Sequence, residues 1–294
     1  MKSASIVALG LFFLVSACAT VSKLDSNLSA SDEASLVAIL EGRDAETKTR
    51  DAARRPLETL SFFGIQSDMA VVEVLPGRGW YTEILAPYLA ERGAIMGLNY
   101  ADDTWPMFGF FTAEQIAETI ERNNAYPMKA KDLAGSDIKA SSTSFGKIAT
   151  SDYGTFDAVL FIRALHNLHR FEAEAGTFTR AVADSNKLLK TGGIVGVVQH
   201  WAPEIAADEW ADGNGGYLKE SRIIELFEAG GFKLVGRSLH NANPNDVPTR
   251  DDVVWRLPPT LNTGKLEGAE KEAAIEKNTA IGESNRIVLK FAKQ

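Results

Sequence analysis

Runs of consecutive apolar residues alternate along the chain with segments in which apolar side chains recur every three or four positions. The first pattern is typical of strands buried on both faces, and the second of helices with one face in a core. The pattern predicts strands at residues 69–75, 94–99, 138–144, 156–162, 194–200, 232–238 and 286–291. It predicts helices at residues 80–92, 112–123, 171–189 and 220–229, preceded by a helix that Ser31 caps.

This alternation predicts an α/β fold with a doubly wound, seven-stranded, mostly parallel sheet. The last strand, at residues 286–291, follows a return connection rather than a crossover helix, so we expect it to run antiparallel. The segment from about 241 to 282 separates the last two strands and is interpreted as an insertion over the ligand edge of the sheet. Residues 31–294 would form this domain.

The first residues have the pattern of an export signal. Lys2 precedes a short apolar run at residues 6–15, which is too short to span a bilayer comfortably. Cys18 is the only cysteine and follows Val-Ser-Ala, which resembles a bacterial lipobox with cleavage before the cysteine and lipid on its sulfur. We therefore expect a signal peptide at 1–17 and a lipidated tether at 18–30. An ordinary signal peptide is the alternative.

The residue after the lipidation site is Ala19 rather than Asp, a pattern that resembles lipoproteins sorted to the outer membrane. This predicts a protein of the bacterial cell envelope that faces the periplasm and contacts the membrane through its lipid. The net charge of -8 argues against nucleic acid as a partner. His166 and His169 lie one helical turn apart without a visible third ligand, so no metal site is predicted. Nothing in the pattern indicates an oligomeric state.

The stretch VVEVLPGRGWYTEIL, residues 71–85, combines a strand, a sharp turn and a helix. Gly77 and Gly79 allow the backbone to turn tightly and to approach a ligand without a Cβ in the way. In doubly wound sheets, ligands bind beyond the carboxyl ends of the strands. A dinucleotide fingerprint would require a third glycine at Thr82, and a phosphate-binding loop would end in Gly-Lys-Ser/Thr. The turn therefore favours another small ligand.

The stretch EVLPGRG resembles motif I of class I S-adenosylmethionine (SAM)-dependent methyltransferases. Two further stretches, FDAVLFIRALHNLH and LLKTGGIVGVV, resemble the fourth strand with its loop and the helix-turn-fifth-strand region of that family. RDAARRPLETLSFFGI and IGESNRIVLKF resemble a group of bacterial proteins described as predicted methyltransferases. The resemblance implies a Rossmann-like class I methyltransferase fold, with SAM as cofactor and a small molecule as methyl acceptor.

The resemblance places Glu73 at the motif's acid and Gly77 and Gly79 at its last two glycines, while Leu75 stands in place of the first. Asn99 occupies the place of the acid that holds the ribose hydroxyls, and Ser144 that of the acid near the adenine. Neither carries the charge that strengthens such hydrogen bonds. Weakened cofactor binding is therefore one expectation.

Further candidates stand near the expected cleft. Trp80 and Tyr81 open the helix after the turn. Trp80 is a candidate for the cofactor site and Tyr81 a catalytic candidate at the cleft, and the alternative for both is a place in the core. Arg163 ends the fourth strand and would bind an anionic group or pair with a carboxylate. His166 follows the predicted strand at 156–162, and His200 ends the one at 194–200, at the same edge of the sheet. Either would serve as base for a hydroxyl or amine acceptor.

Two functions remain open from the sequence. The first is SAM-dependent methyl transfer to a small-molecule acceptor. The second is a catalytically inactive lipoprotein of methyltransferase fold that binds a small ligand in the periplasm, because SAM is made in the cytoplasm. A dehydrogenase is a more distant alternative.

Overall fold

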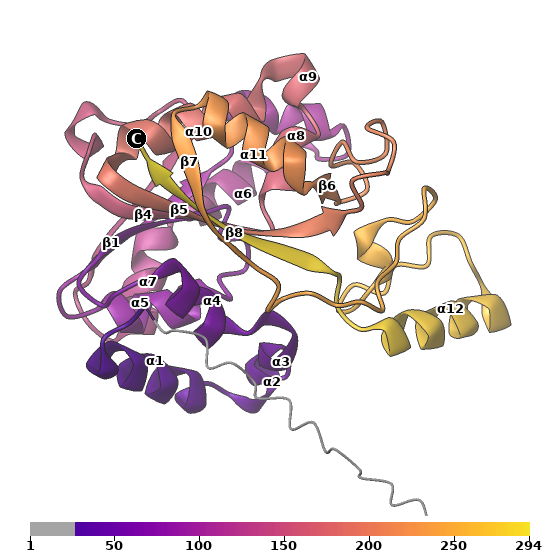
Figure 1. The fold of residues 1–294 in the computed structure, drawn as a ribbon, viewed down its shortest axis with the longest axis horizontal. Coiled ribbons are helices and arrows are strands. Elements are labelled where there is room, and N and C mark those ends of the chain that lie inside the picture. Colours follow the sequence, from indigo (N-terminus) through magenta and orange to yellow (C-terminus); the bar gives the residue numbers. More distant parts are fainter. Residues whose placement is uncertain (1–26) are drawn as a thin grey trace, which may run out of the picture.

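The computed structural model describes residues 27–294, in which a central sheet carries helices on both faces (Figure 1). The predicted signal peptide, the lipidation site at Cys18 and most of the tether lie outside the described residues. The strands are β1 (Ala70–Val74), β2 (Ala94–Asn99), β3 (Lys139–Ser144), β4 (Phe156–Ile162), β5 (Leu189–Ala202), β6 (Leu218–Lys219), β7 (Phe232–Ser238) and β8 (Arg286–Lys293). The helices are α1 (Ala30–Gly42), α2 (Ala45–Lys48), α3 (Asp51–Arg54), α4 (Pro56–Phe63), α5 (Thr82–Leu89), α6 (Ala113–Asn124), α7 (Tyr126–Ala134), α8 (Leu165–His169), α9 (Glu172–Ala175), α10 (Thr177–Leu188), α11 (Glu220–Ala229) and α12 (Gly268–Ile281).

The sheet confirms the predicted doubly wound topology. Its strand order is β3-β2-β1-β4-β5-β8-β7, with the short β6 paired to the end of β5. Among the described strands, β8 alone runs antiparallel to its neighbours β5 and β7. β1 lies at the centre between β2 and β4. The sequence pattern predicted seven strands and missed β6, which has two residues and no hydrophobic signal of its own.

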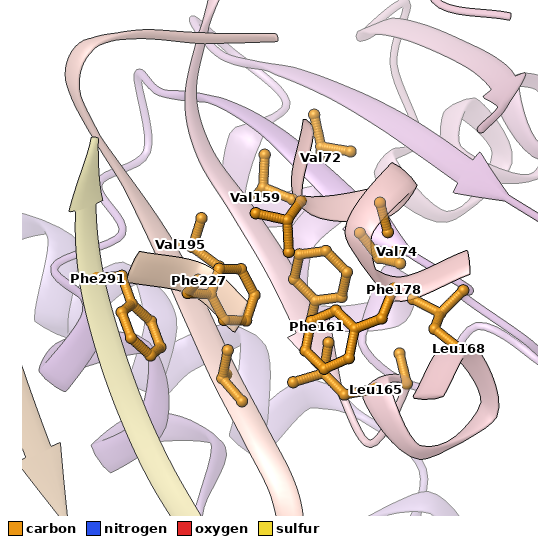
Figure 2. Packing of buried hydrophobic residues seen from close by; sticks show 14 of the residues in the cluster. Val72, Val74, Val159, Phe161, Leu165, Leu168, Phe178, Val195, Phe227 and Phe291 are labelled. Carbon is orange, nitrogen blue, oxygen red and sulfur yellow. The ribbon is translucent and has the colours of Figure 1, made fainter. Parts of the chain in front are cut away.

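Two apolar cores cover the two faces of the sheet. On one face, side chains of β1, β4 and β5 pack against α8, α10 and α11. Figure 2 shows part of this core, with Phe161 and Phe178 beside Leu165 and with Phe227 beside Phe291. On the other face, the strands pack against α1, α4, α5 and α7. Because both faces of the sheet are covered by apolar side chains, polar side chains are expected mainly at the ends of the strands.

Several predicted boundaries are wrong. Ser29, not Ser31, caps α1, because its side chain accepts a hydrogen bond from the backbone of Asp32. The single helix expected at 171–189 is divided into α9 and α10 by Gly176, whose φ of 59° interrupts the helix. The glycines at 192 and 193 do not precede the fifth strand but lie within β5, which begins at Leu189.

The segment at 241–282 leaves the sheet between β7 and β8 and includes α12, which Figure 1 shows beside the sheet rather than over either face. Its earlier part, around Trp255, returns to the carboxyl ends of the strands. Within residues 27–294, no helix has both the length and the apolar character needed to cross a bilayer.

The alternation of side chains along β1 decides where its one acid lies. Val72 and Val74 enter the core shared with α10, so Val71 and Glu73 face α5 and α7. Opposite Glu73 on β2 is Gly97. The ring of Tyr126 packs over this glycine, since an added Cβ would lie 2.7 Å from the Cγ of Tyr126. The absence of a side chain at Gly97 therefore allows Tyr126 to reach Glu73.

We predict that Gly97→Ala destabilises the protein by about 1–3 kcal/mol, because the new methyl group overlaps the Tyr126 ring in a packed core. Chemical denaturation measures the free energy of unfolding. The matched control is Gly42→Ala, where no atom lies within 4 Å of the added Cβ. Equal stability of the two variants would contradict the packing of Tyr126 on Gly97.

Candidate functional site

A cleft of about 520 Å³ opens at the carboxyl ends of β1, β4 and β5. Its walls come from the turn after β1, the turn after β4, the end of β5 with the start of β8, the segment at 50–54 and the segment at 254–260. The cleft brings together most of the predicted site residues, namely Glu73, Leu75, Gly77, Trp80, Tyr81, Arg163, His166 and His200.

The backbone turns sharply at the ends of both central strands. Leu75 follows β1 with φ 49°, and Arg163 follows β4 with φ 57°. Their N–H groups still donate to the neighbouring strands, to Leu98 and Val198 respectively. Left-handed conformations of residues other than glycine cost free energy and gather at functional sites. Both residues line the cleft, which marks this edge as the place where the fold tolerates strain.

The two glycines of the turn have different surroundings. Gly77, with φ 59°, lines the cleft, and an added Cβ would meet only the carbonyl oxygen of Leu75 at 3.8 Å. Gly79, with φ 85°, is not among the lining residues, and its Cβ position is crowded by Lys129. Gly77 is therefore the position where the backbone is open to a ligand, and Gly79 shapes the turn.

Glu73 is buried, and its carboxylate accepts two hydrogen bonds. The hydroxyls of Thr82 and Tyr126 donate to the same Oε2 at 2.8 and 2.9 Å. Burial raises the pKa of Glu73 to about 7, although both hydrogen bonds act in the opposite direction. The carboxyl group is thus engaged by α5 and α7 at the base of the cleft.

Trp80 and Tyr81 precede α5 rather than opening it, because the helix begins at Thr82. The Trp80 ring is contacted by the guanidinium groups of Arg43 and Arg54, at 4.9 and 4.2 Å from its centroid. Tyr81 is buried in the core against α5 and also lines the cleft, and burial raises the pKa of its hydroxyl. Tyr81 therefore belongs to the core and also lines the cleft, the two alternatives that the sequence offered for it.

The two candidate bases lie together. The rings of His166 on α8 and His200 on β5 are 5.2 Å apart between centroids, and both side chains are buried. Nδ1 of His200 lies 2.6 Å from Oγ of Ser284, and Nδ1 of His166 lies 3.4 Å from the amide of Gln199. Burial lowers the pKa of His166 to about 4 and that of His200 well below its usual range. Both rings are therefore uncharged at neutral pH and can accept a proton.

His169 lies elsewhere: its Nδ1 is 2.7 Å from the carbonyl oxygen of Asp212, outside the cleft lining. In the described part of the chain, no group of three or more His, Cys, Asp or Glu side chains is arranged to hold a metal ion.

A cluster of arginines was missed by sequence reasoning, apart from Arg163. Arg50, Arg54 and Arg286 join Arg163 in the lining, and the carboxylate of Glu283 lies among them. Nε of Arg50 donates to Glu283 at 2.6 Å, and Nη2 of Arg286 donates to its other oxygen. Charged residues do flank the apolar runs at 57–65 and 286–291, but no pattern in the sequence indicates that these runs meet.

The structure does not bring Asn99 and Ser144 into the cleft lining. Asn99 is buried, and its Nδ2 lies 3.5 Å from the carbonyl oxygen of Thr143. The nearby Asp102 and Asp103 pair with Lys147 and Arg180, at 2.7 and 2.9 Å. The ends of β2 and β3 thus form no part of the cleft.

SAM has an amino-acid end, a sulfonium carrying the methyl group, and a nucleoside end. The open backbone at Gly77 fits a close approach by its amino-acid end. The polar groups expected at its nucleoside end lie outside the cleft, as the positions of Asn99 and Ser144 show. The cleft therefore fits one end of the cofactor and lacks the expected partners for the other.

We predict that Glu73→Gln changes the pH dependence of stability. Burial raises the pKa of Glu73 from its ordinary value of 4.5 to about 7 in the folded state. Its contribution to stability is therefore present below about pH 4.5 and is lost as pH rises through about 7. The variant should match the wild type near pH 4 and exceed it by about 3 kcal/mol at pH 8.

Urea denaturation from pH 4 to pH 8 measures this difference, and the contributions of His166 and His200 cancel because both proteins contain them. If the free energies of unfolding of wild type and variant changed in parallel with pH, the pKa of the Glu73 carboxyl group would not be raised in the folded protein.

No protein-family model matches the sequence, and no curated protein matches it. Solved structures that match include an arsenic(III) SAM methyltransferase from Chlamydomonas reinhardtii, with 14% identity and a TM-score of 0.44 over 88% of this chain and 72% of that chain. Geranyl diphosphate methyltransferase in complex with SAM matches with 13% identity and a TM-score of 0.46, over 90% and 92% of the two chains. The N-methyltransferase NodS from Bradyrhizobium japonicum WM9 matches with 14% identity and a TM-score of 0.42, over 85% and 98%. At these identities the similarity extends to the fold alone.

Proposed function

We propose that this protein transfers a methyl group from SAM to a small-molecule acceptor bound in the cleft. The position of the cleft is the observation that carries the proposal. It opens between β1 and β4, the neighbours at which the strand order reverses, and the glycine turn after β1 forms one of its walls. Ligands of doubly wound sheets bind at this reversal point.

SAM, when bound, supplies an electrophilic methyl group, so the protein has to hold the acceptor and, for a hydroxyl or amine, remove its proton. His166 and His200 lie on one wall and are uncharged at neutral pH, so either ring can take up a proton, and burial makes both weaker bases than a free imidazole. Trp255 approaches His166, with 5.9 Å between ring centroids, and covers this side of the cleft. The aromatic cover favours exclusion of water from the acceptor.

A second candidate function is that of a binding protein that uses the methyltransferase fold for a different small ligand. The observation that favours it is the position of Asn99 and Ser144 outside the cleft, with Asp102 and Asp103 held in ion pairs. A further observation is Leu75, a left-handed residue where the related motif has glycine. The two candidates differ in whether SAM binds.

We predict that purified protein binds SAM in calorimetric titration and that Gly77→Val weakens this binding at least about tenfold, which corresponds to about 1.4 kcal/mol. The reason is that a side chain at this open position would occupy the ligand's space.

The control is Gly154→Val, because Gly154 also has positive φ, at 65°, and has no atom within 4 Å of an added Cβ. It reproduces the backbone strain outside the cleft and should bind SAM as the wild type does. If the wild-type protein binds neither SAM nor the demethylated product of SAM at the concentrations tested, the result would favour the second candidate.

The proposal also includes location in the bacterial cell envelope, with lipid on Cys18 as the membrane anchor. Cys18→Ser should then release the protein from the membrane fraction or leave an uncleaved precursor, because the sulfur that receives the lipid is gone. Cell fractionation and electrophoretic migration measure both results. A variant that fractionates and migrates like the wild type would show that Cys18 is not lipidated.

A further inference from the structure

Four arginines surround one carboxylate where the ends of β4 and β5 meet the start of β8. Arg163 follows β4, and Arg286 pairs with His200 of β5 in the sheet. Arg50 and Arg54 approach from the segment before α4. Glu283 is the carboxylate that lies among them in the described chain, and it accepts from Arg50 and Arg286. The cluster therefore has three more positive charges than negative ones.

Two of these guanidinium groups, those of Arg54 and Arg163, are not held by hydrogen bonds as Arg50 and Arg286 are in the described part of the protein. Arg54 is 4% exposed, and its Nε and Nη1 are buried without a hydrogen-bond partner. Its nearest approach to Glu283 is 3.9 Å, which is an ion pair without a hydrogen bond. Buried donors without acceptors, as in Arg54, cost free energy and require an explanation. Arg163 is half-buried at the cleft, and its side chain makes no hydrogen bond or ion pair to a described residue.

The remaining charged groups of the cleft do not neutralise this cluster. Glu73 lies in β1, Arg78 in the turn after it and Glu83 at the start of α5. Burial first and the nearby Arg286 second lower the pKa of Arg163 to about 10, whereas Glu283 and Tyr81 act in the opposite direction. Arg163 thus stays charged at neutral pH beside other charges of the same sign.

We propose that this end of the cleft binds the oxyanion group of the acceptor, a carboxylate or a phosphate, through Arg54 and Arg163. Guanidinium groups offer paired N–H donors that match the geometry of both anions. The identification of the occupant as a methyl acceptor rests on the proposed function, whereas the anion subsite rests on the cluster alone.

The charge of SAM supports this assignment. SAM has a sulfonium, an ammonium and a carboxylate, which together give one net positive charge. An arginine cluster with excess positive charge would repel this cation. An anionic acceptor bound at the cluster would neutralise the charge and so reduce the repulsion. The cluster also lies on the β4, β5 and β8 side, away from β2 and β3.

The subsite is tested by thermal unfolding of the purified protein in sodium phosphate, sodium acetate and sodium chloride at one ionic strength and one pH. Phosphate or acetate should raise the melting temperature of the wild type above its value in chloride, and the stronger effect identifies the anion. Arg163→Gln and Arg54→Gln should weaken the apparent affinity for that anion at least about tenfold.

Arg55→Gln is the matched control. Arg55 is exposed, lies outside the cleft lining and has φ 43°, so the substitution removes the same charge at a similar backbone conformation. It should keep the full response to the anion. In chloride, Arg163→Gln should unfold at the same or a higher temperature than the wild type, because repulsion is relieved. A structural role for Arg163 would instead lower the melting temperature in all three salts.

The subsite would be overturned if neither anion raised the melting temperature above its value in chloride. It would also be overturned if Arg163→Gln and Arg55→Gln responded equally to the anion. A calorimetric titration with SAM, with and without the preferred anion, then separates the two proposals. Tighter SAM binding with the anion present supports the acceptor assignment, and competition between them overturns it by assigning the arginines to the cofactor's carboxylate. Anion binding without any SAM binding leaves the subsite in place and contradicts methyl transfer.

Discussion

The parallel sheet has to bury both of its faces, and this constraint determines where chemistry can take place in the molecule. Apolar side chains of β1 and β4 are enclosed by α8 and α10 on one face and by α4 and α5 on the other. Polar groups on these strands are satisfied only near the strand ends. Both central strands end in left-handed residues, Leu75 and Arg163, which turn the chain away from the sheet and open the cleft.

The electrostatics of the cleft follow from burial of like charges around Glu283. This carboxylate connects the segment before α4 with the start of β8, through Arg50 and Arg286. The guanidinium groups also act on His200, whose pKa is lowered first by burial, then by His166 and then by Arg286 and its neighbours. The cleft thus places uncharged imidazoles beside a surplus of guanidinium groups, and this combination is the basis of the two proposals made for it.

Much of the architecture could be predicted from the sequence because buried strands have a strong local signal. The strands at 156–162 and 232–238 match the structure, as does the helix at 220–229. Predictions failed where one residue decided the outcome, as at Gly176, whose left-handed conformation divides a helix whose pattern is continuous. Candidate site residues next to strand ends, such as Arg163 and His166, could be found because parallel strands converge at one edge.

The sequence by itself determined the order of the seven longer strands along the chain and the sharp turn after β1, because these depend on local periodicity and on glycine. Only the tertiary structure decided which distant residues share the cleft. Arg54 meets Arg163 and Glu283 there although they are far apart in the chain. The tertiary structure also placed Asn99 outside the cleft. Both outcomes depend on packing between elements, which leaves no periodic signal in either segment.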